Sequence, residues 1–185
     1  NLTALLAARR AKATDDIWES GVHQKTALLV SSQAHYCVDR SARIMGWGAE
    51  GVVKVPVKQD FTMDVLQLES TLQAARASGL EVIAVVGSAC STATGTFDDL
   101  EEIAAFCRRH DLWFHVDGSH GAASVYSKEY AGRVKGLHLA DSVVMDFHKL
   151  LMTPALATAV IFKEGRWAAA NFAQKAEYLW DDANQ

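Results

Sequence analysis

Two short motifs hold the residues of this chain that are best suited to chemistry. Asp117 ends one apolar run, and Lys149 ends another 32 positions later. A lysine amine can form a Schiff base with an aldehyde, and a carboxylate can keep a pyridine nitrogen protonated. The pair therefore predicts a cofactor that carries both an aldehyde and a pyridine ring, with Lys149 as its covalent anchor.

Each of the two residues also has a simpler interpretation. Lys149 lies between apolar segments, so it should be partly desolvated, which favours the neutral and nucleophilic amine. The alternative is a lysine that extends from a strand end into solvent. Asp117 alone is typical of a carboxylate that caps the next helix. Only the combination of Asp117 with Lys149 indicates a cofactor.

His35 and Thr92 are candidates on other segments. His35 lies at a strand-to-helix junction, where its flat imidazole could stack on a cofactor ring or bond the helix backbone. Thr92 belongs to the polar segment 91–96, which follows the clearest buried strand. Hydroxyl groups there could bond a phosphate, a phenolic oxygen or a substrate carboxylate. The alternative is a polar loop whose side chains bond their own backbone.

Several histidines accompany the two motifs. His120 and His148 could bond a cofactor, whereas His115 lies inside a strand and is expected to be a core residue. A metal site is the competing interpretation, and its ligands would be Asp117, His120, Asp146 and His148. We expect no metal, because the spacing matches no HExxH or comparable motif. A serine nucleophile is also weakly supported, since the chain has no GxSxG segment.

The elements that must position these residues alternate between apolar strands and amphipathic helices. Strands are expected at residues 26–31, 52–57, 81–87, 112–116, 141–146 and 158–163. Helices are expected at residues 2–18, 35–45 and 65–77, from 98 or 99 to 110, and at 164–179. This alternation predicts an α/β fold with a mostly parallel sheet that helices cover on both faces. Segments 87–92, 117–121 and 146–149 should then meet at the carboxyl edge, where such sheets bind ligands.

Composition excludes several classes of protein. Of the 185 residues, 50% are hydrophobic and 22% are charged, with a formal net charge of −4, which is ordinary for a globular domain and gives no sign of nucleic-acid binding. Cys37, Cys90 and Cys107 are odd in number and form no CxxC pair, so a reducing, cytoplasmic location is expected. No apolar stretch reaches the ~18–20 residues that span a membrane.

Taken in order, these motifs resemble the large domain of the group II pyridoxal-phosphate-dependent amino acid decarboxylases. That family includes the glutamate, aromatic-amino-acid, cysteine-sulfinate and diaminobutyrate decarboxylases. The resemblance covers essentially the whole chain, with Pro154 five residues after the lysine as a further match. The matching segments are residues 1–5, 31–36, 91–95 with Phe97-Asp98, 115–117 and His148-Lys149.

The resemblance implies a fold, a cofactor and roles for individual residues. The fold would be the large domain of the PLP-dependent transferases (fold type I), and the cofactor would be pyridoxal 5′-phosphate. Lys149 would form the Schiff base, Asp117 would pair with the pyridine nitrogen, and His35 would stack on the ring.

Three further residues would complete the cofactor site. Thr92 and Ser119 would contact the ring or its phenolic oxygen from the other side, and His148 would help to seat the cofactor or the substrate carboxylate. Asp146 stands where some relatives have asparagine near the phosphate, and no phosphate contact is assigned to it because a carboxylate would repel that group. Departures from the common family pattern, such as the one at Asp146, leave the identity of the amino acid substrate undecided.

The implied reaction is the decarboxylation of an L-amino acid to its amine and CO₂ by a homodimer, without a nucleic-acid or membrane partner. Alternatives are another enzyme of the same fold (aldehyde-lyase, desulfurase or aminotransferase) or an inactive homologue that serves as a scaffold. Residues 1–185 would be a fragment of the cofactor-binding large domain. The phosphate loop would precede Asn1, and the small C-terminal domain would follow Gln185.

Overall fold

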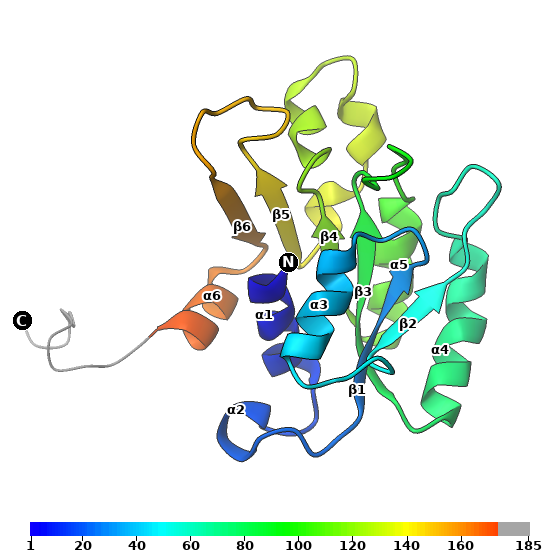
Figure 1. The fold of residues 1–185 in the computed structure, drawn as a ribbon. Helices are drawn as coiled ribbons and strands as arrows, with labels where there is room; N and C mark the ends of the chain where they lie inside the picture. Colours follow the sequence, from blue (N-terminus) through cyan, green and yellow to red (C-terminus); the bar gives the residue numbers. More distant parts are fainter. Residues whose placement is uncertain (174–185) are drawn as a thin grey trace, which may run out of the picture.

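A six-stranded sheet forms the centre of the chain in the computed structural model, which describes residues 1–173 (Figure 1). The strands follow the order β2-β1-β3-β4-β5-β6, and every neighbouring pair is parallel except the antiparallel pair β5 and β6. Their bounds are β1 (Thr26–Ser31), β2 (Val52–Val55), β3 (Glu81–Ser88), β4 (Trp113–Asp117), β5 (Ser142–Asp146) and β6 (Thr158–Phe162). The predicted α/β class with a mostly parallel sheet is confirmed.

Helices cover both faces of the sheet. Their bounds are α1 (Leu2–Lys12), α2 (Ile17–Ser20), α3 (Tyr36–Ile44), α4 (Leu68–Ala77), α5 (Leu100–His110) and α6 (Gly165–Phe172). In β1, Leu28 and Val30 pack with α1 and α3, whereas Ala27 and Leu29 pack with α4 and α5. Because successive side chains of a strand point to opposite faces, a strand that is buried on both faces is apolar throughout.

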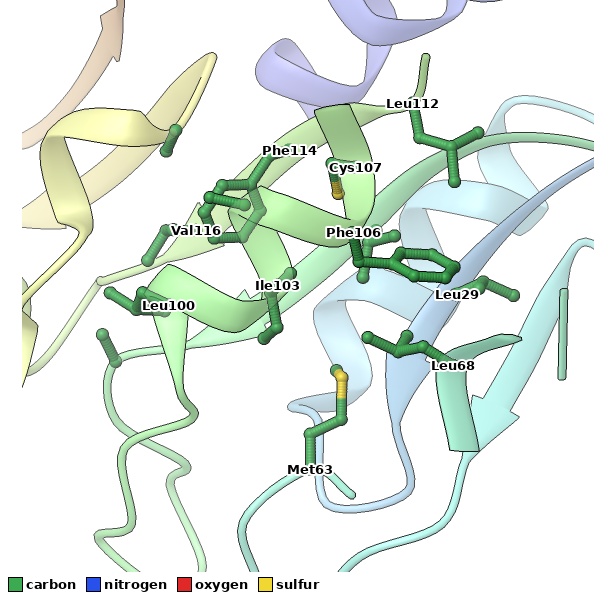
Figure 2. Packing of buried hydrophobic residues seen from close by; sticks show 14 of the residues in the cluster. Leu29, Met63, Leu68, Leu100, Ile103, Phe106, Cys107, Leu112, Phe114 and Val116 are labelled. Atoms are coloured by element: carbon green, nitrogen blue, oxygen red, sulfur yellow. The ribbon is translucent and has the colours of Figure 1, made fainter. Parts of the chain in front are cut away.

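The apolar layer beneath α4 and α5 is shown in Figure 2. Ile103 and Phe106 of α5 lie in one buried cluster with Leu29, Phe114 and Val116 of the sheet. Burial of a side chain of this size contributes roughly 1.5–3 kcal/mol to stability. The layer therefore makes the sheet a rigid platform for the segments that follow its strands.

The helices differ from expectation mainly at their ends. The helix expected at 2–18 is broken, because Ala13 is extended and the side chain of Asp16 caps the separate helix α2. The helix expected from 65 begins as a 3₁₀ turn that Asp64 caps, and α4 starts at Leu68. The last expected helix is observed at Gly165–Phe172, and its expected extension to 179 lies outside the described residues. Among the helices of residues 1–173, none combines the length and the apolar character that a bilayer crossing requires.

The two aspartates before α5 have different roles. Asp99 is the N-cap, and its carboxylate accepts a hydrogen bond from the backbone N–H of Glu102 at 3.1 Å. Asp98 is buried instead, and its oxygens accept hydrogen bonds from the backbone N–H groups of Met63 at 2.7 Å and Ser88 at 2.8 Å. Burial raises the pKa of Asp98. Asp98 therefore ties the loop before α4 to the end of β3.

We expect an Asp98→Ala substitution to destabilise the protein by about 2–4 kcal/mol, because it leaves two buried N–H donors without an acceptor. Asp99→Ala is the matched control and removes only a helix cap, at a cost of about 1 kcal/mol. Urea unfolding of the full-length protein, followed by tryptophan fluorescence, compares the two variants. Equal midpoints for the two variants would contradict the assigned role of Asp98.

Candidate active site

The carboxyl ends of β3, β4 and β5 bring three segments together at one edge of the sheet (Figure 1). The backbone N–H of Ala89 donates to the carbonyl of Asp117 at 2.8 Å, and the N–H of Gly121 donates to the carbonyl of Ala89 at 2.8 Å. The N–H of Asp146 donates to the carbonyl of Ser119 at 3.0 Å. The structure therefore joins the three segments that the sequence places at this edge.

Gly121 permits this close approach. A Cβ atom at Gly121 would lie 2.8 Å from both the carbonyl oxygen of Ala89 and the backbone nitrogen of Cys90. Distances below 3.0 Å to backbone atoms cannot be relieved by a side-chain rotation, so only glycine fits here. The segment after β4 is thus packed directly against the segment after β3.

Asp117 is the last residue of β4, and hydrogen-bond donors surround its carboxylate. One oxygen, Oδ1, accepts from the backbone N–H of Ser119 at 3.3 Å and from its hydroxyl at 2.5 Å. The other, Oδ2, accepts from Asn1 Nδ2 at 3.1 Å and from Cys37 Sγ at 3.7 Å. The two bonds from Ser119 are local turn contacts, but the donors to Oδ2 come from the N-cap of α1 and from α3. Asp117 is therefore a hydrogen-bond acceptor that long-range contacts hold in place.

The Cys37 thiol can serve as one of these donors only while it is protonated. Burial, and then the neighbouring Asp117 carboxylate, raise the pKa of Cys37 to about 11. The thiol therefore keeps its proton at neutral pH and directs it toward Asp117.

Lys149 lies just beyond β5, where it forms an ion pair with Asp146. Its Nζ atom is 3.0 Å from Asp146 Oδ2, and its side chain is 37% exposed. Asp146 Oδ1 also accepts from the Thr158 hydroxyl at 2.6 Å. Burial raises the pKa of Asp146, but the bonds from Thr158 and Lys149 outweigh burial and hold that pKa below its usual value. Asp146 is therefore a charged partner that holds the Lys149 side chain at the sheet edge.

Asp117 and Lys149 both act on a third residue, Cys90. Burial is the main reason why the pKa of the Cys90 thiol is raised. The Asp117 carboxylate raises it further, whereas the Lys149 ammonium lowers it. The Cys90 thiol therefore keeps its proton at neutral pH.

His35 is the residue that precedes α3, and it lies two positions before Cys37, whose thiol donates to Asp117. Its Nδ1 atom accepts from the backbone N–H of Cys37 at 3.3 Å, so His35 caps the helix. Its ring centroid is 4.2 Å from that of Tyr36. The structure thus shows the backbone-bonded arrangement of a half-buried imidazole.

Thr92 and the remaining histidines occupy different surroundings. Thr92 is exposed in the loop after β3, and the preceding Ser91 bonds the carbonyl of Gln33 at 3.1 Å. His120 is also exposed. His148 is turned toward the backbone of Ala157, with Nδ1 3.1 Å from its carbonyl oxygen. In residues 1–173, no three or more His, Cys, Asp or Glu side chains form a group that could hold a metal ion.

Sequence reasoning missed some residues of this site. Asn1 contacts Asp117 and His115, and Ser142 contacts the other side of the His115 ring. Asn1 belongs to a segment that matches the family, but no role followed for its side chain, and Ser142 lies inside an expected strand. The sequence alone assigns no role to Asp146, although its spacing of three residues from Lys149 is compatible with a local ion pair.

Fold and site together define an α/β domain with an amine and a carboxylate at the carboxyl edge of a mostly parallel sheet, the edge at which sheets of this kind bind ligands. The family model described as the pyridoxal-dependent decarboxylase conserved domain matches residues 1–185. The chain belongs to this family.

Named relatives agree with this assignment. The chain is 30% identical over 181 residues to an aromatic-L-amino-acid decarboxylase of Bacillus atrophaeus, a match that covers 98% of this chain and 36% of the relative. It is 33% identical over 192 residues to an aspartate 1-decarboxylase of Aliivibrio fischeri, covering 97% of this chain and 35% of the relative. The chain therefore spans about a third of the length of these relatives.

Solved structures share the fold. The crystal structure of mouse CSAD matches with a TM-score of 0.90 and 29% identity, over 99% of this chain and 39% of that one. The glutamate decarboxylase domain of a Vibrio parahaemolyticus protein matches with a TM-score of 0.83 and 32% identity, over 90% of this chain and 37% of that one. The predicted fold type I is thereby confirmed.

Proposed function

We propose that the protein containing this chain uses pyridoxal 5′-phosphate to convert an L-amino acid into the corresponding amine and CO₂. The observation that carries this proposal is the placement of the Lys149 amine and the donor-bound Asp117 carboxylate at the carboxyl ends of the neighbouring strands β5 and β4, whose following segments are joined by a hydrogen bond from Asp146 N–H to the Ser119 carbonyl. The two groups match the aldehyde and the pyridine nitrogen of the cofactor. Family membership supports the same reaction.

Lys149 would hold the aldehyde carbon of the cofactor, and Asp117 would hold its pyridine nitrogen as the protonated form. When bound, the cofactor supplies an electron sink for the pair of electrons that the departing CO₂ leaves behind. Asp117 makes this sink effective because it is ionised and therefore favours the positive charge on the nitrogen.

The other residues would position the cofactor and the substrate. His35 would cover one face of the ring, Thr92 and Ser119 would lie on the opposite side, and His148 would help to seat the cofactor or the substrate carboxylate. The Ser119 hydroxyl donates to Asp117, so its contribution includes the orientation of that carboxylate.

Asp146 would influence the protonation state of the Lys149 amine. It pairs with the Lys149 ammonium, and the amine becomes a nucleophile only after it loses its proton. The ion pair keeps the side chain at the sheet edge until that proton leaves.

We further propose a cytoplasmic homodimer in which residues 1–185 form part of the cofactor-binding large domain. Three exposed apolar residues close to Lys149, Leu151, Met152 and Leu156, support an interface on this side of the chain. The free thiols Cys37, Cys90 and Cys107 are consistent with a reducing compartment.

Product analysis tests the reaction. We expect the full-length protein, supplied with pyridoxal phosphate and a panel of acidic, aromatic and diamino L-amino acids, to release CO₂ and an equal amount of amine from at least one substrate. The reason is that the bound cofactor would accept the electron pair that remains when the bond to the carboxylate breaks. A keto acid, a released aldehyde or released sulfur would instead indicate another enzyme of the same fold. No turnover of any amino acid would favour the inactive scaffold.

A further inference from the structure

A chain of hydrogen-bonded side chains, buried except for the half-buried Asn1, extends behind Asp117, away from the sheet edge. It begins with Trp113 on β4, whose Nε1 atom donates to Ser142 Oγ on β5 at 2.8 Å. Ser142 Oγ lies 2.9 Å from His115 Nδ1, and His115 Nε2 lies 2.7 Å from Asn1 Oδ1. Asn1 Nδ2 then donates to Asp117 at 3.1 Å. The sheet register creates this chain, because it places His115 directly opposite Ser142.

The two ends of the chain constrain the direction of the side-chain hydrogen bonds between them. An indole N–H is only a donor, and an ionised carboxylate is only an acceptor. Asn1 must therefore turn its amide nitrogen toward Asp117, which leaves its oxygen facing His115 Nε2. That oxygen requires a proton on Nε2.

The same reasoning applies from the other end. Ser142 Oγ accepts the Trp113 proton, so its own proton is available for His115 Nδ1 at 2.9 Å. Nδ1 also lies 3.2 Å from the Ser142 carbonyl oxygen, a longer contact than the 2.7 Å between Nε2 and Asn1 Oδ1, so the proton is assigned to Nε2. This arrangement satisfies a neutral imidazole with its proton on Nε2. His115 is 0% exposed, and burial lowers its pKa to about 4, which disfavours the doubly protonated ring.

We propose that His115 and Asn1 are positioning residues which hold the Asp117 carboxylate in the orientation that the pyridine nitrogen requires, with His115 as the neutral Nε2–H tautomer. This inference rests on the proposed function. Asn1 donates a hydrogen bond to one carboxylate oxygen of Asp117 and Ser119 donates to the other, so both oxygens are held in place. His115 touches neither the carboxylate nor the sheet edge and acts through Asn1.

Two substitutions of His115 separate the N–H donor from the bulk of the ring. In the full-length protein, His115→Gln can present an amide N–H near the Nε2 position, whereas His115→Leu fills the space without a donor. We expect His115→Leu to raise the Kd for pyridoxal phosphate roughly tenfold, as for the loss of one hydrogen bond to a charged network. His115→Gln should stay within about threefold of the wild type. Quenching of tryptophan fluorescence in the apoprotein measures both values.

A second variant keeps the test valid if His115→Leu fails to fold. Asn1→Asp preserves shape but replaces the donor toward Asp117 with a second carboxylate, so it should weaken cofactor binding more than His115→Leu does. Equal affinities in the wild type, His115→Leu and Asn1→Asp would overturn the proposal. Equal weakening in His115→Leu and His115→Gln would also overturn it, because the N–H donor would then be irrelevant.

The tautomer of His115 can be determined by NMR without any cofactor. In apoprotein labelled with ¹⁵N-histidine, the resonances lost in His115→Gln identify His115, and we expect one protonated and one unprotonated ring nitrogen, with the proton on Nε2. A proton on Nδ1 would overturn the direction of the network. A wild-type protein that binds no pyridoxal phosphate would instead refute the proposed function, whatever the tautomer shows.

Discussion

Replacing Lys149 by alanine is expected to lower kcat for CO₂ release on the order of 10⁴-fold or more, because the same amine would anchor the cofactor and transfer protons during turnover. The substitution removes a side chain that is partly exposed and that contributes one ion pair, so the fold should be retained. Radiometric CO₂ release from the full-length protein measures the effect.

Two control variants isolate the reason for the loss. Lys149→Arg keeps a cation that can pair with Asp146, but a guanidinium does not lose its proton in proteins, so it should be as inactive as Lys149→Ala. Lys135→Ala removes a surface lysine that pairs with Glu101 at 2.9 Å, and it should retain full activity. An active Lys149→Arg enzyme would show that the positive charge matters and the nucleophilic amine does not.

An Asp117→Asn substitution is expected to lower kcat roughly 10²–10³-fold, the cost of removing one preorganised electrostatic partner from a reacting centre. The amide has the same shape but no negative charge, so it cannot favour a protonated pyridine nitrogen. It also presents an N–H group to donors that now bond the carboxylate, among them Asn1 and Ser119. Steady-state kinetics on the full-length protein give kcat and KM separately.

The carboxylate can be partly restored at this position. Asp117→Glu retains the charge on a longer side chain and should therefore recover part of the activity that Asp117→Asn loses. Thermal unfolding of the variants provides the control for folding. If Asp117→Asn has the same kcat as the wild type, Asp117 does not pair with the cofactor nitrogen.

The sequence could predict the parts of the site that depend on local order. Continuous apolar runs identify the strands that are buried on both faces of a parallel sheet. Because the carboxyl ends of parallel strands lie at the same edge, residues 117 and 149 are then expected at that edge. These inferences need only the chain around each residue. Helix ends were less accurate, because the carboxylate of Asp16 begins a new helix where the Ala-rich composition alone favours one long helix.

The contacts behind Asp117 could not be predicted in the same way. Asn1 reaches residues more than a hundred positions away, and Ser142 meets His115 only through the register of β4 and β5. Small polar residues such as these carry no periodic pattern, and their partners are known only once the strands are aligned. The choice between Asp98 and Asp99 as the cap of α5 likewise depends on which side chain the loop before α4 buries.

The most direct test of the account is to locate the lysine that binds the cofactor. Full-length protein is mixed with pyridoxal phosphate, reduced with borohydride to make the link permanent, digested with trypsin and analysed by mass spectrometry. We expect a phosphopyridoxyl group on the peptide that contains Lys149, and no such label on that peptide in the Lys149→Arg variant. A label on a different lysine, or no label in the wild type, would contradict the central claim.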